Sequence, residues 1–277
     1  MDEQTFRVLE FDRVLELPAA FAVTVPGRAV VRRIRPLATI GEIRSRSAVI
    51  SECRRLYSEG RSLGLEHFDD LVPLFQKLVP ADAVLEPLEL RAFLPLFYSA
   101  LILMTLGNDP SFSNLAEIVL HLTTQPELRK TIEGAIDREG KIRDGASPEL
   151  ARVRKGIRHC EDRIKGLLEG FLQQKDLALY LQDFYVAERN KRWVLPVKRD
   201  FKGHIPGIVH DISNTGETVY VEPYSVQHAG NELESFRAEE KLEEYRILRS
   251  ISSVLRERLR EIEGDYHIVV RVDALQA

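Results

Sequence analysis

The sequence predicts a mainly α protein that carries a small β-rich insertion. Residues 1–146 repeat apolar side chains at helical spacing, and residues 147–177 repeat them at the heptad spacing of a coiled coil. Between 178 and 224 the pattern changes to short alternating runs broken by turn formers, which indicates strands. Residues 225–263 then return to a long, charged helical pattern. We therefore expect an N-terminal helical core, a long antiparallel coiled-coil arm and a β module at its tip.

The composition is that of a folded protein without a strong charge bias. Of the 277 residues 30% are charged and 44% are hydrophobic, and the formal net charge is −4. This excludes a globally basic nucleic-acid binder but not a local basic patch. The two cysteines exclude a disulfide scaffold. The histidines show no metal-ligand spacing, so we expect no metal site in these residues.

The first 25 residues do not resemble a secretory signal, because they contain Glu10, Asp12 and Glu16. The longest apolar run, 93–106, contains Pro95 and is too short to span a bilayer. We therefore expect a cytoplasmic protein with no membrane partner.

Residues 1–146 are expected to form a helical core or connector domain. Apolar residues recur at helical spacing in 6–21 and again in 40–57. Residues 88–106 are apolar nearly all round, which is typical of a helix buried in a core. Prolines separate these segments from one another.

The outgoing helix of the expected arm has the clearest start signal. Ser147 is a good N-cap, Pro148 suits the first helical turn, and Glu149 complements the helix dipole. Apolar residues then follow at alternating intervals of three and four, namely Leu150, Val153, Ile157, Cys160, Ile164, Leu167 and Phe171. The spacing predicts a coiled-coil seam in which Cys160 is a plain core residue.

Residues 178–224 are expected to form the β-rich module. Two strands flank a turn at 189–191. Two further strands, at 205–210 and 218–222, flank the run 211–216, which is dense in turn-forming residues.

The returning helix of the arm is expected at 225–263. Its stretch 231–263 contains no glycine or proline and could extend over about 50 Å. Residues 264–277 begin apolar and are expected to open a downstream segment.

The β-rich module contains a local excess of positive charge. Residues 185–210 hold six basic residues against Glu188 and Asp200. Several cations on a firm surface are what a phosphate backbone requires. The candidate nucleic-acid-binding residues are Arg189, Lys191, Arg192, Trp193, Lys198, Arg199 and Lys202.

Aromatic side chains interleave with these cations and could stack on bases. They are Tyr185, Trp193, Phe201 and His204. The alternative is a solvated hairpin whose Trp193 packs inward.

The residues suggest no catalytic constellation. His210, Asp211 and Ser213 lie in or beside a turn, where Asp and Ser normally cap backbone groups. Glu222 ends a strand and is expected to be structural. The mixed charges on the two long helices are expected to be solvated faces and cross-helix ion pairs. This chain by itself is therefore not expected to be an enzyme or to hold a cofactor.

Several motifs resemble bacterial MutS-like proteins of the second type. The lever helix of that family starts with a motif similar to K-I-R-D-G-A-S-P-E-L-A-R-V-R (141–154). Its clamp motifs are similar to R-N-K-R-W-V-L-P-V-K (189–198) and G-I-V-H-D-I-S-N-T-G-E-T-V-Y-V-E-P (207–223). Its opening is similar to F-D-R-V-L-E-L (11–17), and its returning helix starts like N-E-L (231–233).

The resemblance implies a core, lever and clamp region, in which the coiled-coil arm is the lever and the β module is the clamp. Full-length members add an ATPase domain that uses ATP and Mg²⁺, form homodimers and usually end in a nuclease-like domain. They are linked to branched-DNA binding with suppression of recombination, and to rescue of collided ribosomes. The sequence has no G-x-x-x-x-G-K-[ST] loop, so ATP binding and endonuclease activity are expected elsewhere in a full-length protein.

Two functional hypotheses stay open. The first is a module of a MutS-like ATPase that engages branched or duplex DNA, or ribosomal RNA, with a steep dependence on salt. The second is a structural coiled-coil arm for dimerisation or protein docking, whose contacts depend weakly on salt.

Overall fold

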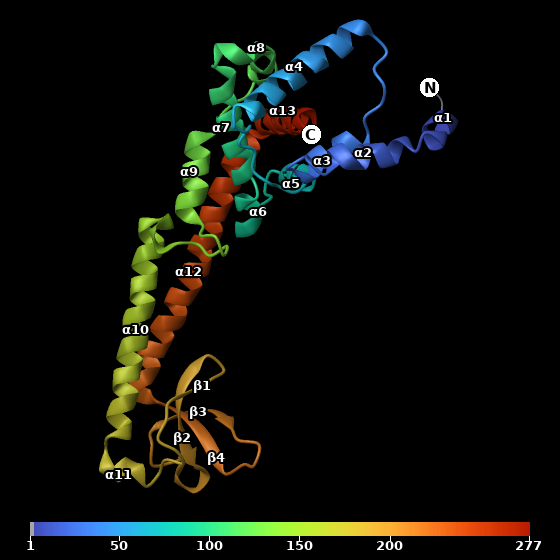
Figure 1. Ribbon diagram of the computed structural model, residues 1–277. Coiled ribbons are helices and arrows are strands. Elements are labelled where there is room, and N and C mark those ends of the chain that lie inside the picture. The colour runs from blue at the N-terminus through green and yellow to red at the C-terminus, as the bar shows by residue number, and fades with distance from the viewer. Residues whose placement is uncertain (1–2) are drawn as a thin grey trace. The chain divides into compact units, whose positions relative to one another are not determined.

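The computed structural model describes residues 3–277, which divide into two compact units (Figure 1). Unit 1 comprises the chain up to Arg143 together with Ile247–Ala277, and unit 2 comprises Asp144–Arg246. Unit 2 is therefore inserted into the sequence of unit 1. One helix, α12 (Tyr224–Glu257), runs from unit 2 into unit 1.

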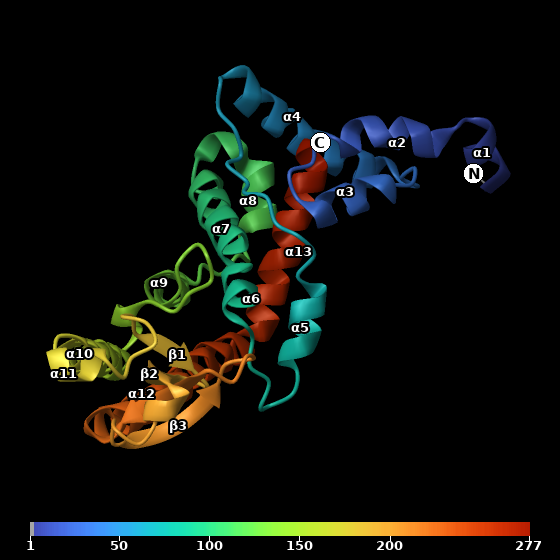
Figure 2. The ribbon, with the colours of Figure 1, turned by 90° about the horizontal axis from the view of Figure 1, so that it is seen from below.

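Unit 1 is helical. Its elements are α1 (Glu3–Val8), α2 (Phe11–Ala19), α3 (Val25–Arg32), α4 (Ile40–Ser58), α5 (Val72–Leu78), α6 (Pro87–Arg91), α7 (Leu94–Gly107), the 3-10 helix η1 (Pro110–Phe112), α8 (Ser113–Val119), α9 (Pro126–Ala135) and α13 (Leu259–Gln276). The last helix, α13, packs against α3, α4, α7 and α8 and runs through the middle of the unit (Figure 2). The residues 264–277, expected to open a further segment, lie in α13 and pack in this core.

The apolar helix expected at 88–106 is observed as α6 and α7. Leu96, Phe97 and Leu103 of α7 are buried in the core of unit 1, as predicted. By length and composition, residues 87–107 are the one stretch of the described chain that could cross a membrane. A buried core helix meets the same criteria, and half of the residues of α7 are buried.

Two buried aspartates of α13 hold neighbouring segments of unit 1. Asp273 accepts hydrogen bonds from the backbone N–H groups of Val23 (2.9 Å) and Thr24 (2.8 Å) and from the Thr24 hydroxyl (2.6 Å). Asp265 accepts from the Thr123 N–H (2.7 Å) and the Thr123 hydroxyl (2.9 Å). Since a carboxylate has several acceptor sites, each aspartate satisfies groups that a buried loop would otherwise leave unpaired.

Unit 2 combines helices with a small antiparallel sheet. Its elements are the 3-10 helix η2 (Asp144–Ala146), α10 (Pro148–Leu172), α11 (Lys175–Ala178), β1 (Ala187–Arg189), β2 (Arg192–Lys198), the 3-10 helix η3 (Arg199–Phe201), β3 (Gly207–Ile212), β4 (Thr218–Pro223) and the first part of α12. The strands lie in the order β1-β2-β4-β3. The Ser147 hydroxyl accepts from the Leu150 N–H (3.0 Å), which confirms the predicted N-cap of α10.

The hairpin between β1 and β2 turns at Asn190 and Lys191. Both residues have positive φ angles, 49° and 63°, and Arg189 pairs with Arg192 across the turn. This is the conformation of a type I′ turn, and it forms although no glycine is present.

The expected fold class of a long coiled-coil lever arm with a β clamp at its tip is wrong. The structure agrees with the prediction only in its general composition, which is a mainly helical chain with a small antiparallel sheet. Of the predicted seam, Leu150, Val153, Cys160 and Ile164 are buried as predicted. Ile157, Leu167 and Phe171 are only partly buried, whereas Leu168 is fully buried. Across the described part of α12, no residue between Leu233 and Ile251 is buried, so no continuous apolar seam joins two long helices.

The physical reason is that the sheet shares one core with the helices. Cys160, Ile164 and Leu168 of α10 pack together with Leu195, Val197 and Val221 of the sheet and with Val226, Ala229 and Leu233 of α12. Their spacing on α10 is four residues, which suits a broad sheet-facing stripe and not a heptad seam. The predicted core position of Cys160 is confirmed. Unit 2 is thus a mixed helix and sheet body and not a coiled coil with an appendage.

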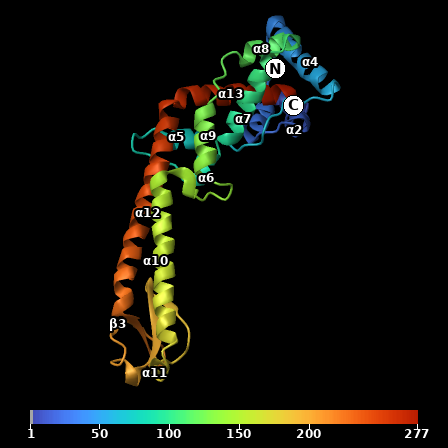
Figure 3. The ribbon, with the colours of Figure 1, turned by 90° about the vertical axis from the view of Figure 1, so that its left-hand side faces the viewer.

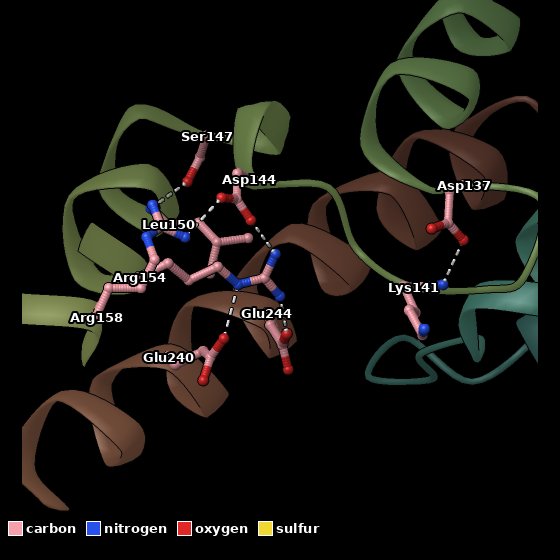
Figure 4. A network of polar contacts seen from close by, with 9 residues as sticks. All are labelled: Asp137, Lys141, Asp144, Ser147, Leu150, Arg154, Arg158, Glu240 and Glu244. Carbon is pink, nitrogen blue, oxygen red and sulfur yellow. Dashed lines mark hydrogen bonds and ion pairs between the residues drawn. The ribbon is translucent and has the colours of Figure 1, made fainter. Parts of the chain in front are cut away.

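Ion pairs join α10 to α12 where the apolar seam is absent. The two helices run side by side and antiparallel in unit 2 (Figure 3). Arg154 donates to Glu240 (2.7 Å) and Glu244 (2.7 Å) of α12 and to Asp144 (2.8 Å) of η2 (Figure 4). Hydrogen bonds from Arg154 and Arg158 hold the pKa of Asp144 below its usual range.

Replacing Arg154 with alanine is expected to lower the free energy of unfolding of unit 2 by about 1–2 kcal/mol. The side chain is only 18% exposed, and its loss would leave three neighbouring carboxylates without their shared cation. Urea unfolding would measure the change. The matched control is Arg158→Ala, because Arg158 is 59% exposed and pairs with Asp144 alone among the described residues. Equal losses in the two variants would contradict the assignment.

Candidate nucleic-acid interface

The predicted cations lie at the two opposite ends of strand β2. Arg189, Lys191 and Arg192 lie at the β1–β2 turn, and we call them the hairpin group. Lys198, Arg199 and Lys202 lie at the other end of β2 and in η3. A seven-residue strand separates the two groups by about 20 Å. The structure therefore does not bring the six cations together in one patch.

Two arginines of the hairpin group are already engaged. The Arg189 guanidinium lies over the Tyr220 ring, 4.6 Å from its centroid, and 3.6 Å from the Asp211 carboxylate. Arg192 donates to the Asn231 side chain (2.8 Å) and lies 3.4 Å from Glu222. Because nearby carboxylates compensate both charges, these arginines offer little free potential to a phosphate.

Lys191 lies apart from these contacts. It is exposed in the turn, with a positive φ of 63°. It lines a charged groove of about 520 Å³ with Glu188, Glu234, Arg237, Ala238, Glu240 and Lys241. The groove has three carboxylates and three cations in its lining, so it carries no net positive charge to attract an anion.

The neighbouring His210 belongs to a polar cluster around Glu222. His210 lies at a β-bulge in β3. The Nε2 atom of His210 lies 2.6 Å from the buried Glu222 carboxylate. The Ser213 hydroxyl instead accepts from the Thr218 N–H (3.1 Å), which is the turn-capping role that the sequence suggested. Glu222 thus binds His210 and Arg192 and ties β4 to β3 and β2.

Trp193 is partly buried and packs against the core of unit 2. Its indole Nε1 is buried and has no hydrogen-bond partner among the described residues. This is the inward packing that formed the alternative interpretation of the sequence. The indole is therefore not a free stacking surface.

The second group of cations lies beside three rings. The ring centroids of Tyr180, Phe201 and His204 are 4.6–5.5 Å apart. We name Tyr180, Lys198, Arg199, Phe201, Lys202 and His204 the basic–aromatic cluster.

Two of the three cations of the basic–aromatic cluster bond to backbone carbonyls, and the third is exposed. Lys198 donates to the Leu179 carbonyl (3.1 Å) and Arg199 to the Gly216 carbonyl (3.4 Å). Lys202 is exposed. None of the three forms an ion pair with a described carboxylate, in contrast to Arg189 and Arg192. Their charge is therefore available to an external anion.

Sequence reasoning missed Tyr180. The segment that carries it runs beside the end of β2, where Lys198 N–H donates to the Tyr180 carbonyl (2.9 Å) and Leu181 bridges to Val197. The short apolar run Leu-Tyr-Leu at 179–181 was the signal that could have revealed an extended segment here.

The described residues contain no cluster of three or more His, Cys, Asp or Glu side chains that could hold a metal ion. No phosphate-binding loop of the P-loop type occurs in the sequence. ATP and Mg²⁺ therefore do not fit the residues present, and no step through them is assigned to this chain.

Comparison with known proteins places the chain among MutS-like sequences. No protein-family model matches it. It is 31% identical over 281 residues to the protein named Endonuclease MutS2 of Solidesulfovibrio magneticus, an alignment that covers 100% of this chain and 36% of the relative. It is 36% identical over 256 residues to that of Symbiobacterium thermophilum (92% of this chain, 32% of the relative) and 32% identical over 279 residues to that of Carboxydothermus hydrogenoformans (100% and 35%).

These alignments run through nearly the whole chain but only part of each relative. The chain spans about a third of the length of the curated relatives it matches. The alignments agree with the resemblance that the motifs in α10, the strands and α12 indicated. The chain belongs to the MutS-like proteins of the second type, the MutS2 family.

Proposed function

We propose that unit 2 contacts the phosphate backbone of DNA or RNA through Lys198, Arg199 and Lys202. The observation that supports this is the difference between the two ends of β2. At the hairpin end the arginines are paired with Asp211 and Glu222, whereas at the other end Lys198 and Arg199 bond to backbone carbonyls and Lys202 is exposed. Cations that form no internal ion pair can displace counterions from a phosphate backbone without first breaking such a pair.

The contact is expected to be independent of sequence. Lysine and arginine side chains on a short strand end and a 3-10 turn reach phosphates, but they are not carried on an element that enters a groove. Asp200 follows Arg199 in sequence, and Glu217 lies close in space, where its carbonyl accepts from the Arg199 N–H (2.9 Å), so both carboxylates moderate the local charge. The binding should therefore be moderate in affinity and steep in its salt dependence.

For the whole protein, we propose that this contact serves the nucleic-acid-related activity of MutS2 proteins. The target would be branched or duplex DNA in recombination suppression, or ribosomal RNA in ribosome rescue. A homodimeric, cytoplasmic protein with an ATPase domain that uses ATP and Mg²⁺, and with endonuclease activity in other regions, is part of the same proposal. Nothing in these 277 residues is assigned a catalytic role.

The test is binding of the 277-residue chain to duplex DNA and to structured RNA across a salt series. The variant Lys198→Ala/Arg199→Ala/Lys202→Ala is expected to weaken binding at low salt by tenfold or more. Its slope of log K against log salt should be smaller by about 2–3, since three phosphate contacts are lost. Fluorescence anisotropy measures both quantities.

A matched control removes three exposed cations elsewhere in unit 2, as Lys155→Ala/Arg158→Ala/Lys165→Ala on α10. It changes the net charge equally, so equal weakening in both variants would show a general charge effect and contradict the site. Absence of binding by the unchanged chain at low salt would refute the proposal and favour protein docking.

A further inference from the structure

We infer that His204, supported by Tyr180 and Phe201, stacks on an unpaired nucleobase. The basic–aromatic cluster would then favour nucleic acid whose bases are exposed at a bulge, branch or loop. This inference rests on the proposed function and adds the structural class of ligand that the same site selects.

The rings form a supported platform. The His204 ring lies 4.6 Å from Tyr180 and 5.5 Å from Phe201, and Tyr180 lies 5.3 Å from Phe201, measured between centroids. Phe201 is partly buried and packs against the core of unit 2, whereas His204 is exposed. Two partly buried rings therefore hold the outer ring, which lowers the ordering cost of a base that stacks on it.

The placement of the cations suits a nucleotide, which carries a phosphate, better than an aromatic ligand without a phosphate. Lys202 precedes His204 by two residues, and the Arg199 side chain reaches the β3–β4 turn at Gly216. When a base stacks on His204, the phosphate of that nucleotide and the phosphates of the adjacent nucleotides would lie close to these cations. At the hairpin end, the Tyr220 ring is 8% exposed and is covered by Arg189, so it offers no comparable surface.

Selection for unpaired bases follows from geometry. In a fully paired duplex the faces of internal bases are covered by their stacked neighbours, and a surface ring cannot reach them. Bases in bulges and loops can be splayed out and stacked on Phe, Tyr, Trp or His. DNA and RNA both present such bases, so the shared ligand is an unpaired base flanked by phosphates.

The experiment compares three probes that differ only at their centre. One duplex is fully paired, one carries a bulge of three thymidines, and one carries a bulge of three abasic residues. The abasic bulge has the phosphates and the flexibility of the thymidine bulge but no bases. RNA versions of the probes, with uridines in place of thymidines, show whether the unpaired base is recognised in DNA, in RNA or in both. Anisotropy titrations at low salt use the 277-residue chain and its variants His204→Ala, His204→Phe and Lys198→Ala/Arg199→Ala/Lys202→Ala.

The unchanged chain is expected to bind the base-containing bulge about fivefold or more tightly than the abasic one, in DNA, RNA or both. His204→Ala should reduce that ratio to about one. His204→Phe should keep it, since phenylalanine preserves a stacking ring and carries no charge. Because His204 is exposed, none of these changes should affect folding, which a thermal melt checks.

Three results overturn the inference in different ways. Equal affinity for both bulges, with binding still lost in the triple cation variant, would refute stacking and leave the proposed phosphate contact intact. A preference that His204→Ala does not alter would assign the recognition to other residues. Absence of binding to every probe would refute the proposed function and the inference together.

Discussion

Replacing Asp273 with alanine is expected to lower the free energy of unfolding of unit 1 by about 3–5 kcal/mol. The Asp273 carboxylate is fully buried and accepts from two backbone N–H groups and one hydroxyl, at Val23 and Thr24. A buried donor that loses its acceptor costs about 1–3 kcal/mol. The carboxylate also sits at the start of α3, where the helix dipole favours negative charge.

The fit around Asp273 explains why solvent cannot replace it. A Cβ atom added at Gly27 would lie 2.1 Å from the Asp273 Oδ2, so the first turn of α3 approaches the carboxylate closely. Hydrogen exchange of α3 and α13 amides in a urea series would report unit 1 separately from unit 2. The control is Asp82→Ala, an exposed aspartate whose loss should change stability by less than about 0.5 kcal/mol. A similar loss in the two variants would refute the structural role of Asp273.

Replacing Asp265 with asparagine is expected to stabilise unit 1 by about 2–3 kcal/mol at pH 7 and to leave its stability unchanged near pH 4. Burial raises the pKa of the Asp265 carboxyl to about 6, and hydrogen bonds from Thr123 offset only part of that rise. An asparagine side chain can accept from the Thr123 N–H and donate to the Thr123 hydroxyl, so it preserves both contacts without a charge.

The sign of the pH dependence follows from the raised pKa. The folded state holds the proton more tightly than the unfolded state, whose carboxyl has a pKa near its ordinary value of 3.8. The contribution of Asp265 to stability is therefore fully present below about pH 3.8 and is lost as the pH rises through about 6. Urea unfolding of the original chain and the variant at pH 4, 5, 6 and 7 would measure the difference. A difference that is constant across this range would contradict the prediction.

The local elements could be predicted because their signals are local. The Ser147 cap, the start of α10 and the buried apolar helix α7 follow from propensity and periodicity, and the structure has them. The prediction of a long coiled coil was wrong because it depended on which element packs against α10. Sequence spacing alone does not distinguish a helix facing another helix from one facing a sheet, and Leu168 replaces Leu167 at the buried position.

The candidate site was predictable in composition and not in arrangement. The six cations are obvious in the sequence, but their division between the two ends of β2 depends on the hairpin register, Arg189 opposite Arg192. The carboxylates that compensate Arg189 and Arg192 come from β3 and β4, 22 and 30 residues further along the chain. Tyr180 joins His204 and Phe201 only because residues 180–182 lie beside the end of β2.

The insertion of unit 2 into unit 1 also sets the order in which the chain can fold during translation. The helices of unit 1 up to Arg143 leave the ribosome before unit 2, whereas α13, which supplies the buried Ile262, Tyr266 and Val269, is made after unit 2. At about 5–20 residues per second, synthesis of unit 2 delays α13 by roughly 5–20 s. The nascent chain therefore exposes the apolar faces that α13 later covers, and a translational pause within unit 2 would prolong its dependence on chaperones.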